Sequence, residues 1–130
     1  MTHLNFVNIF AKDIERLSRF YIDLFGFSEN EEMRYPIFRE VRAGSISLGF
    51  NAEEAYSLLS LEDFKNAQGV GFLLNFECDS EDAVDSLVSR LVELGGTIVK
   101  DPYKTYYGWY QAVALDPEGN CFRLNHMGRA

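Results

Sequence analysis

One short pattern occurs twice in the chain and constrains its fold more than any other feature. The stretch FVNIFAKD, which begins at Phe6, stands just before a strongly patterned helical segment, and FLLNFECD, which begins at Phe72, stands before a second one. With these two residues aligned, Asp13 falls on Asp79 at the same offset. Each stretch therefore reads as a strand that leads into a helix, and the repetition predicts an internal duplication of one structural unit.

The first half of the chain has the pattern of one such unit. Apolar residues recur at helical spacing after Asp13, whose carboxylate can cap the helix, and Gly26 can end it in a left-handed conformation. Short β-favouring stretches separated by turn residues follow this helix. The expected elements are a strand over 4–10, a helix up to Gly26, and strands over 27–33, 37–43 and 45–50.

The second half repeats this order. Either Asp79 or Ser80 can cap the second helix, and two glycines at 95 and 96 can stop it. A segment of mixed composition, 52–67, connects the halves and is expected to be partly helical. The remaining expected elements are a strand over 70–77, the helix, and strands over 97–100, 110–115 and 120–125.

Length and composition indicate one folded domain. The chain has 130 residues, of which 47% are hydrophobic and 15% aromatic, which excludes a disordered protein. No apolar run approaches the roughly 18 residues that a membrane span requires. The N-terminal stretch lacks the basic segment and the cleavage site of a signal peptide. We therefore expect a cytoplasmic protein in which Cys78 and Cys121 are reduced thiols.

The net charge narrows the range of partners. Twelve basic residues against 20 acidic ones give a charge of −8, which repels nucleic acids and anionic membranes at long range. We therefore expect neither a nucleic-acid nor a membrane partner. The same charge mildly favours cationic small molecules.

Four stretches resemble one known family. They are AKDIERLSRFYIDLFGF, VGFLLNFECDSEDAVDSLVSRLVELGG, YYGWYQAVALDPEGN and CFRLN, and they are similar to the vicinal oxygen chelate superfamily of glyoxalase I, bleomycin-resistance proteins and extradiol dioxygenases. The resemblance implies an α+β fold in which two βαβββ modules form a curled mixed β-sheet cleft. It places the first module at 1–51, the connection at 52–68 and the second module at 69–127, all within one domain of residues 1–130.

The resemblance also implies where a metal would bind. Enzymes of the family hold a divalent metal through His, Gln or Glu side chains on the first and last strand of each module, and these four positions fall on Phe6, Ser47, Phe72 and Arg123. Phenylalanine has no donor atom and a guanidinium has no lone pair to give. A serine hydroxyl alone is a poor ligand. We therefore expect no metal and no cofactor.

A shift in strand register would bring other side chains to these positions, because a shift of one residue turns a side chain to the opposite face. Such a shift does not produce a plausible metal set. The two histidines lie near the ends of the chain, where they are expected on the surface. The nearby candidate donors are His3, Asn5, Asn8, Asn75, Asn125 and His126.

Without a metal, the cleft is expected to bind an organic molecule. Phe6 and Phe72 would make its centre apolar and aromatic, which suits a planar or hydrophobic ligand. Ser47 is also expected to contact the ligand. The aromatic stretch DPYKTYYGWYQ would add rigid contact area with polar ends. Within it Tyr106 and Tyr107 are the better ligand candidates, whereas Trp109 is either a ligand contact or a strand residue packed on the core.

Arg123 has two interpretations as an inward cation. It could clamp a carboxylate or phosphate of the ligand, or it could form an internal salt bridge with Glu40, Glu77 or another carboxylate. The 20 acidic residues favour the salt bridge. Glu77 could itself receive a cationic ligand near the rim.

Three functions from different classes fit these features. The favoured one is metal-free binding of a small aromatic or hydrophobic molecule, cationic ones included, by a homodimer, as in the bleomycin-resistance proteins that the chain resembles. The second is a metal-dependent glyoxalase-like lyase, isomerase or dioxygenase with its ligands at other residues. The third is a non-catalytic subunit whose cleft is filled by its own side chains.

Overall fold

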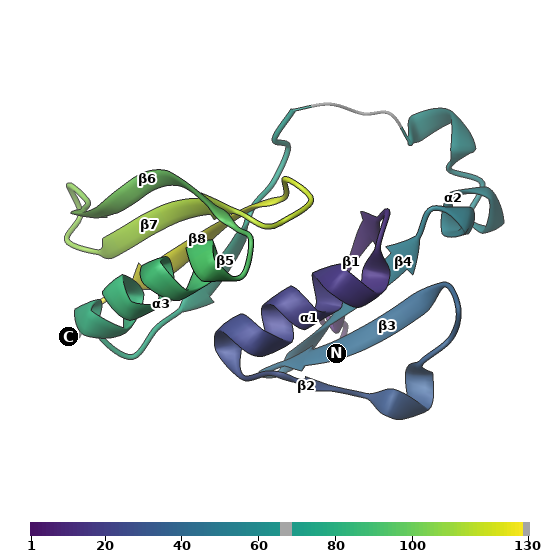
Figure 1. Ribbon diagram of the computed structural model, residues 1–130, viewed down its shortest axis with the longest axis horizontal. Coiled ribbons are helices and arrows are strands. Elements are labelled where there is room, and N and C mark those ends of the chain that lie inside the picture. The colour runs from purple at the N-terminus through teal and green to yellow at the C-terminus, as the bar shows by residue number, and fades with distance from the viewer. Residues whose placement is uncertain (66–68, 129–130) are drawn as a thin grey trace. The chain divides into compact units, whose positions relative to one another are not determined.

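The structure is a computed structural model that describes residues 1–65 and 69–128. The chain divides into two compact units, Met1–Gln68 and Gly69–Ala130. The first unit contains β1 (Phe6–Ala11), α1 (Ile14–Phe25), β2 (Ser28–Glu29), a 3-10 turn η1 (Glu31–Met33), β3 (Phe38–Ala43), β4 (Ile46–Ala52), α2 (Glu54–Leu58) and a second 3-10 turn η2 (Glu62–Phe64). The second contains β5 (Leu74–Glu77), α3 (Glu81–Glu93), β6 (Thr97–Lys104), β7 (Tyr110–Leu115) and β8 (Cys121–His126) (Figure 1).

The two units share one topology. The four strands of the first unit lie in the order β1-β4-β3-β2, and those of the second lie in the order β5-β8-β7-β6. In both, the first strand is parallel to the last and the other pairs are antiparallel. This is an α+β fold of two βαβββ modules, as the sequence predicts. We call β1–β4 with α1 the first module and β5–β8 with α3 the second module.

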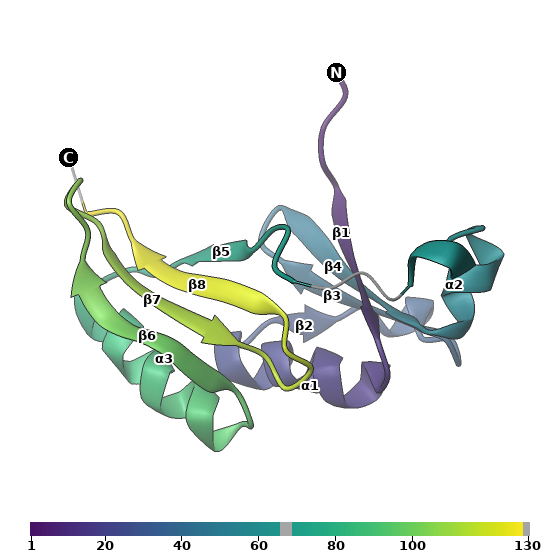
Figure 2. The same cartoon turned by 90° about the horizontal axis from the view of Figure 1, so that it is seen from above.

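In each module one helix covers one face of the sheet. In the first module, Leu48 and Phe50 of β4 are buried beneath α1, and the Phe50 ring lies 5.7 Å from that of Tyr21 between centroids. In the second, α3 lies against the sheet (Figure 2), and Phe122 and Leu124 of β8 are fully buried. Since side chains alternate along a strand, the residues between these point to the opposite face. We call that face of each sheet its open face.

The two helix caps correct the alignment of the repeat by one residue. Asp13 caps α1 by accepting a hydrogen bond from Arg16 N at 2.9 Å. Ser80, rather than Asp79, caps α3 by accepting one from Ala83 N at 3.0 Å. The modules are therefore related by an offset of 67 residues, because the two capping residues are the matching positions.

This correction changes which residues correspond. At the new offset Leu73, and not Phe72, matches Phe6, and Asn75 matches Asn8. The strand that was expected from residue 70 begins only at Leu74, so Phe72 precedes it. A change of one residue matters because it turns every side chain of a strand to the other face.

Substitution of the two candidate residues tests which of them caps α3. Ser80→Ala is expected to destabilise the second module by about 1 kcal/mol, because it removes the acceptor for one of the free N–H groups at the start of α3. Asp79→Ala, the matched control, should change the free energy of unfolding by less than about 0.5 kcal/mol. Urea unfolding of both variants measures these differences. The reverse ranking would restore the original alignment.

Two other expected elements differ from the structure. The strand predicted over 27–33 is only the two-residue β2, followed by the turn η1. β6 continues past the predicted end at residue 100 to Lys104, because it pairs with β7 across two irregularities of register. The connection does contain short helices, as predicted, and its residues 66 and 67 lie outside the described residues.

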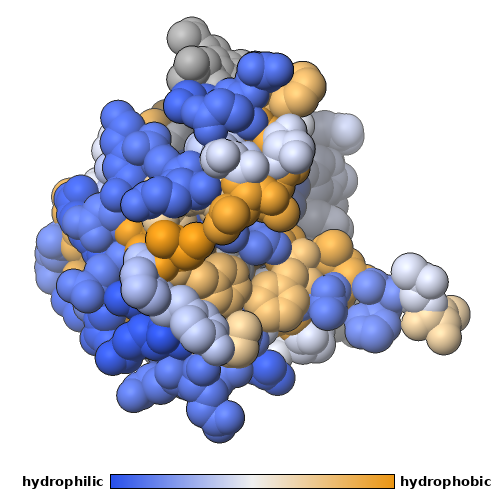
Figure 3. Space-filling view, turned by 90° about the vertical axis from the view of Figure 1, so that its right-hand side faces the viewer, coloured by the Kyte–Doolittle hydropathy of each residue, from blue (hydrophilic) through white to orange (hydrophobic). Residues whose placement is uncertain are grey.

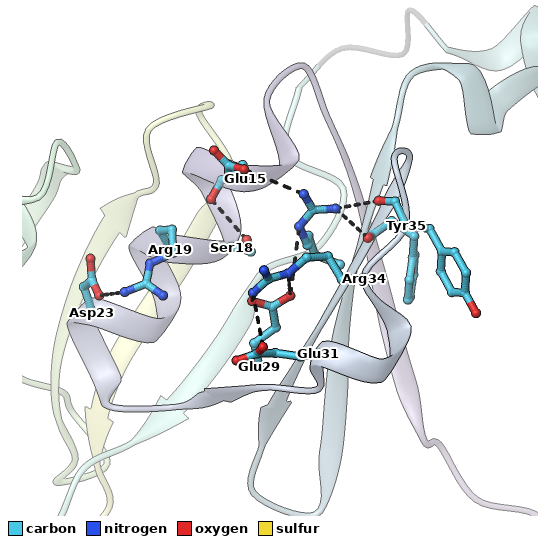
Figure 4. A network of polar contacts seen from close by, with 10 residues as sticks. Glu15, Ser18, Arg19, Asp23, Glu29, Glu31, Arg34 and Tyr35 are labelled. Carbon is cyan, nitrogen blue, oxygen red and sulfur yellow. Dashed lines mark hydrogen bonds and ion pairs between the residues drawn. The ribbon is translucent and has the colours of Figure 1, made fainter.

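Charged side chains link β2 to β3 and to the residue after η1 (Figure 4). Arg34 of the turn makes two hydrogen bonds to Glu29, at 2.6 and 2.8 Å, and these bonds lower the pKa of that carboxyl. Arg39 of β3 donates to the backbone oxygen of Tyr35 at 2.5 Å and lies 3.7 Å from Glu15 of α1. Glu29 of β2 is thus tied to Arg34, the residue that follows η1.

The connecting helices expose apolar side chains. α2 is anchored because the Tyr56 ring stacks on Phe10 of β1, with centroids 4.1 Å apart. Leu58 at its end and Leu59 and Phe64 after it have exposed fractions of 73%, 55% and 69%. Figure 3 looks onto the side of Figure 1 where α2 lies and shows hydrophobic surface there among hydrophilic side chains. None of the helices described is long and apolar enough to cross a membrane.

Candidate functional site

The open face of the first module holds a buried carboxylate. Glu40 of β3 is only 4% exposed. Its carboxylate accepts hydrogen bonds from Ser47 Oγ at 2.7 Å, Asn30 Nδ2 at 3.1 Å and Arg42 Nη1 at 3.4 Å. The bond from Ser47 is the largest of the effects that keep the pKa of Glu40 below its ordinary value. The charge of Glu40 is thus satisfied within the module.

This network defines the position of Ser47, one of the predicted ligand-binding residues. Ser47 is 3% exposed and pairs with the half-buried Phe6 of β1. Its hydroxyl hydrogen is given to Glu40. The two residues are therefore neighbours, as the sequence predicts, but Ser47 acts within the module as a hydrogen-bond donor to a buried charge.

Around Gly49 the open face is closely packed. A Cβ atom at Gly49 would lie 2.9 Å from Asn8 Nδ2 and 3.0 Å from the Phe38 ring. Asn8 in turn donates to Asn51 Oδ1 at 2.7 Å. The missing side chain of Gly49 therefore leaves room for Asn8 and Phe38, which occupy the middle of this face.

In the second module the open face carries Arg123. Its Nε donates to Asn75 Oδ1 at 2.6 Å, across the parallel pair β5–β8. The internal salt bridge expected with Glu40 or Glu77 is absent from the part of the chain that the structure describes. The neutral amide of Asn75 replaces it, because the register places Asn75 directly beside Arg123.

A polar cluster lies further along the same face. Glu77 accepts from Asn125 Nδ2 at 3.0 Å through one oxygen and from the backbone N of Met127 at 2.9 Å through the other. Gln111 is opposite Asn125 in the sheet and is 1% exposed. Within the described residues, Asn125 Oδ1 is the buried side-chain atom that has no hydrogen-bond partner.

Gln111 makes two long hydrogen bonds to tyrosine side chains. Tyr103 Oη donates to Gln111 Oε1 at 3.4 Å, and Gln111 Nε2 donates to Tyr107 Oη at 3.3 Å. Both distances are long for hydrogen bonds, so both contacts are weak. Gln111 was not singled out from the sequence. The signal available was its place between the buried-strand residues of YQAVAL, where a polar side chain must point away from the helix.

The predicted aromatic residues form one cluster in the loop between β6 and β7. Tyr107 makes edge-to-face contacts with Tyr106 and Trp109, with centroids 4.9 and 5.0 Å apart. Tyr106 is fully exposed, Tyr107 is 46% exposed, and Trp109 is half-buried. Phe72 is also exposed, at 68%, on the segment before β5. The loop thus presents aromatic surface beside the Gln111 cluster.

The positions where the resemblance implies metal ligands carry none of the His, Gln or Glu side chains that the family's enzymes use. In the first module Phe6 has no donor and the Ser47 hydroxyl is committed to Glu40. In the second module Arg123 pairs with Asn75. The equivalent pair in the first module is Gly49 with Asn8, so Gly49 corresponds to Arg123. Within residues 1–65 and 69–128 no group of three or more His, Cys, Asp or Glu side chains could hold a metal ion.

The two βαβββ modules define the chain as a paired-module α+β protein, and comparison with known proteins gives its family. The model of the Glyoxalase/Bleomycin resistance protein/Dioxygenase superfamily matches residues 3–124. The chain belongs to this superfamily. A comparison with proteins of curated function gives no match.

Solved structures agree with this assignment. A glyoxalase/bleomycin resistance protein/dioxygenase family enzyme from Burkholderia phytofirmans PsJN is 50% identical over 98% of this chain and 100% of its own, with a TM-score of 0.95. A glyoxalase-related enzyme from Fulvimarina pelagi is 20% identical over 97% and 88%, with a TM-score of 0.80. Lactoylglutathione lyase from Agrobacterium tumefaciens is 19% identical over 97% and 94%, with a TM-score of 0.71. The last two show the fold alone.

Proposed function

We propose that the protein binds a small aromatic or hydrophobic molecule, cationic ones included, without the help of a metal ion. The observation that carries this proposal is the donor set at the positions where the family's enzymes bind metal. Phe6 and Arg123 have no lone pair to give to a divalent cation, and the Ser47 hydroxyl, which donates its hydrogen to Glu40, is a poor ligand by itself. The open faces nevertheless keep polar and aromatic groups that suit an organic ligand.

Two further features support a ligand of this class. Tyr106, Tyr107 and Trp109 present rigid aromatic surface with polar ends, a composition found at binding surfaces. The net charge of −8 raises the local concentration of cations around the chain. Aromatic ammonium compounds satisfy both preferences.

The Burkholderia protein is described as an enzyme and is 50% identical to this chain, which gives a second candidate. In that case the protein would be a metal-dependent lyase, isomerase or dioxygenase. It would then have to draw its metal ligands from residues other than the four predicted positions.

Metal content and thermal stability distinguish these two functions. Protein purified without added metal or chelator is expected to contain less than one metal ion per chain and to show no change in melting temperature with Ni²⁺, Zn²⁺, Mn²⁺ or Fe²⁺. A panel of aromatic amines should raise the melting temperature, since a ligand at 100 times its Kd stabilises the folded state by about 2.7 kcal/mol. Stoichiometric metal, or a clear shift with one of these ions, would favour the enzyme instead.

The aromatic loop can be tested in the same assay. Tyr106→Ala should reduce the stabilisation by aromatic amines without changing the melting temperature of the free protein, because this side chain is fully exposed. Tyr35→Ala, a control at a half-exposed tyrosine of the first module, should leave the stabilisation unchanged. Equal effects of the two substitutions would exclude the loop from the binding site.

A further inference from the structure

The buried acceptor on the second module's open face points to one chemical feature of the ligand. Asn125 is 4% exposed, and its Oδ1 has no partner among the described residues. Its orientation is fixed, because Nδ2 donates to Glu77 Oε1 and a carboxylate can only accept. A flipped amide would place two oxygens against each other. The oxygen, and not the nitrogen, is therefore the free atom.

Glu77 makes this oxygen a strong acceptor. Hydrogen bonds in a chain polarise one another, and the carboxylate that accepts from Nδ2 draws negative charge toward Oδ1. Each oxygen of Glu77 accepts one hydrogen bond, from Asn125 Nδ2 and from Met127 N. Asn125 Oδ1 is the buried acceptor of this cluster without a partner among the described residues, and its polarisation favours a charged N–H donor over a neutral one.

The neighbour of Asn125 across the sheet is held by a weak hydrogen bond. Gln111 lies opposite Asn125 and is joined to Tyr107 by a hydrogen bond of 3.3 Å. Tyr107 is 46% exposed, so its ring can turn toward solvent at little cost. Because its oxygen accepts from Gln111, the hydroxyl hydrogen of Tyr107 is left to donate.

We propose that Asn125 Oδ1 binds an N–H group of the ligand when the Tyr107 ring turns away from Gln111, so that the protein selects aromatic ammonium or amidinium compounds with at least one N–H. This inference rests on the proposed function and specifies it. It assigns the cation's selection to a hydrogen bond with an amide oxygen, and not to a charge pair with Glu77. Tyr107 and Trp109 supply the aromatic contact.

Two cations with the same ring and charge, one with N–H groups and one without, test this. 1-Naphthylmethylammonium carries three N–H donors, and its N,N,N-trimethyl derivative carries the same charge and ring without any. Titration of the ¹⁵N-labelled protein followed by NMR should show the first binding at least about ten times more tightly, because a site built to hydrogen-bond an N–H rejects the analogue that lacks it. The side-chain amide signals of Asn125 should shift with the first compound only.

The variant Asn125→Ala should remove the difference between the two compounds, while Asn5→Ala, at an exposed asparagine of the first module, should keep it. If Asn125→Ala does not fold, the Asn125 amide signals of the unmodified protein still decide. Equal affinity for both compounds would overturn the inference and leave the proposed function standing. Amide signals that respond to neither compound, as expected if an ordered water alone occupies the site, would also overturn it. Failure of every aromatic compound to bind would refute both.

Discussion

Gly96→Ala is expected to destabilise the second module by about 2 to 3 kcal/mol, because the space beside this glycine is already filled. A Cβ atom there would lie 2.9 Å from Leu91 Cδ1 and 3.0 Å from the backbone oxygens of Leu91 and Leu115. Leu91 of α3 is fully buried, and Leu115 pairs with Thr97 in the sheet. Neither backbone oxygen can move without disturbing the junction of α3 with β6 and β7.

The fluorescence of Trp109, the single tryptophan of the chain, reports on unfolding of this module in urea. Gly71→Ala is the matched control, since a Cβ atom at Gly71 would meet nothing within 4 Å. It should change the free energy of unfolding by less than about 0.5 kcal/mol. If the two substitutions have equal effects, the packing of α3 against β6 and β7 differs from that described.

The same junction matters for the ligand site. β6 and β7 carry Tyr103 and Gln111, whose hydrogen bond depends on the relative position of the two strands. A Gly96→Ala protein that still folds is therefore expected to bind aromatic amines less tightly. We therefore expect the stability of the second module and the affinity of the proposed ligand site to fall together in this variant.

The repeat was visible in the sequence because both strand-to-helix junctions carry apolar strands and capping residues. Its offset was wrong by one residue, because Asp79 and Ser80 can both cap a helix and only the geometry shows which one does. The consequence was largest for Phe72. Side chains alternate between the two faces of a strand, so an error of one residue assigns a side chain to the wrong face. Phe72 lies before the first residue of β5 and is not part of the strand.

The candidate site was harder to predict than the fold. The aromatic residues 106, 107 and 109 could be found from composition, and the structure does bring them together. Gln111 could have been found from its place among the apolar residues of YQAVAL. The free oxygen of Asn125 could not, because it depends on the contact of Asn125 with Glu77, 48 residues away, which leaves no local pattern in the sequence.

Arg123 shows a similar limit. The excess of acidic over basic residues favoured a salt bridge between Arg123 and a carboxylate. Strand register decided otherwise by placing Asn75 beside it. Glu40, one of the partners considered, is instead satisfied by Ser47, Asn30 and Arg42 within its own module.

Ser47→Ala is expected to destabilise the first module by about 2 kcal/mol at pH 7, because it leaves a buried carboxylate without its shortest hydrogen bond. The pKa of Glu40 lies below its ordinary value of 4.5 chiefly because of this bond. The carboxylate therefore stabilises the fold at pH values above 4.5, and this contribution is lost as the pH falls through the lowered pKa. Ser47→Ala raises that pKa, so the difference from the unmodified protein should shrink at acid pH.

Urea unfolding followed by circular dichroism between pH 3 and pH 7 measures this dependence. Ser45→Ala, at an exposed serine of the preceding turn, should leave stability unchanged over the whole range. Ser47 was also predicted to contact the ligand, and the two roles separate in this experiment. A Ser47→Ala protein with normal stability at pH 7 but weaker binding of aromatic amines would show that the hydroxyl serves the ligand. Lower stability that recovers relative to the unmodified protein at acid pH, with unchanged binding, would assign it to Glu40.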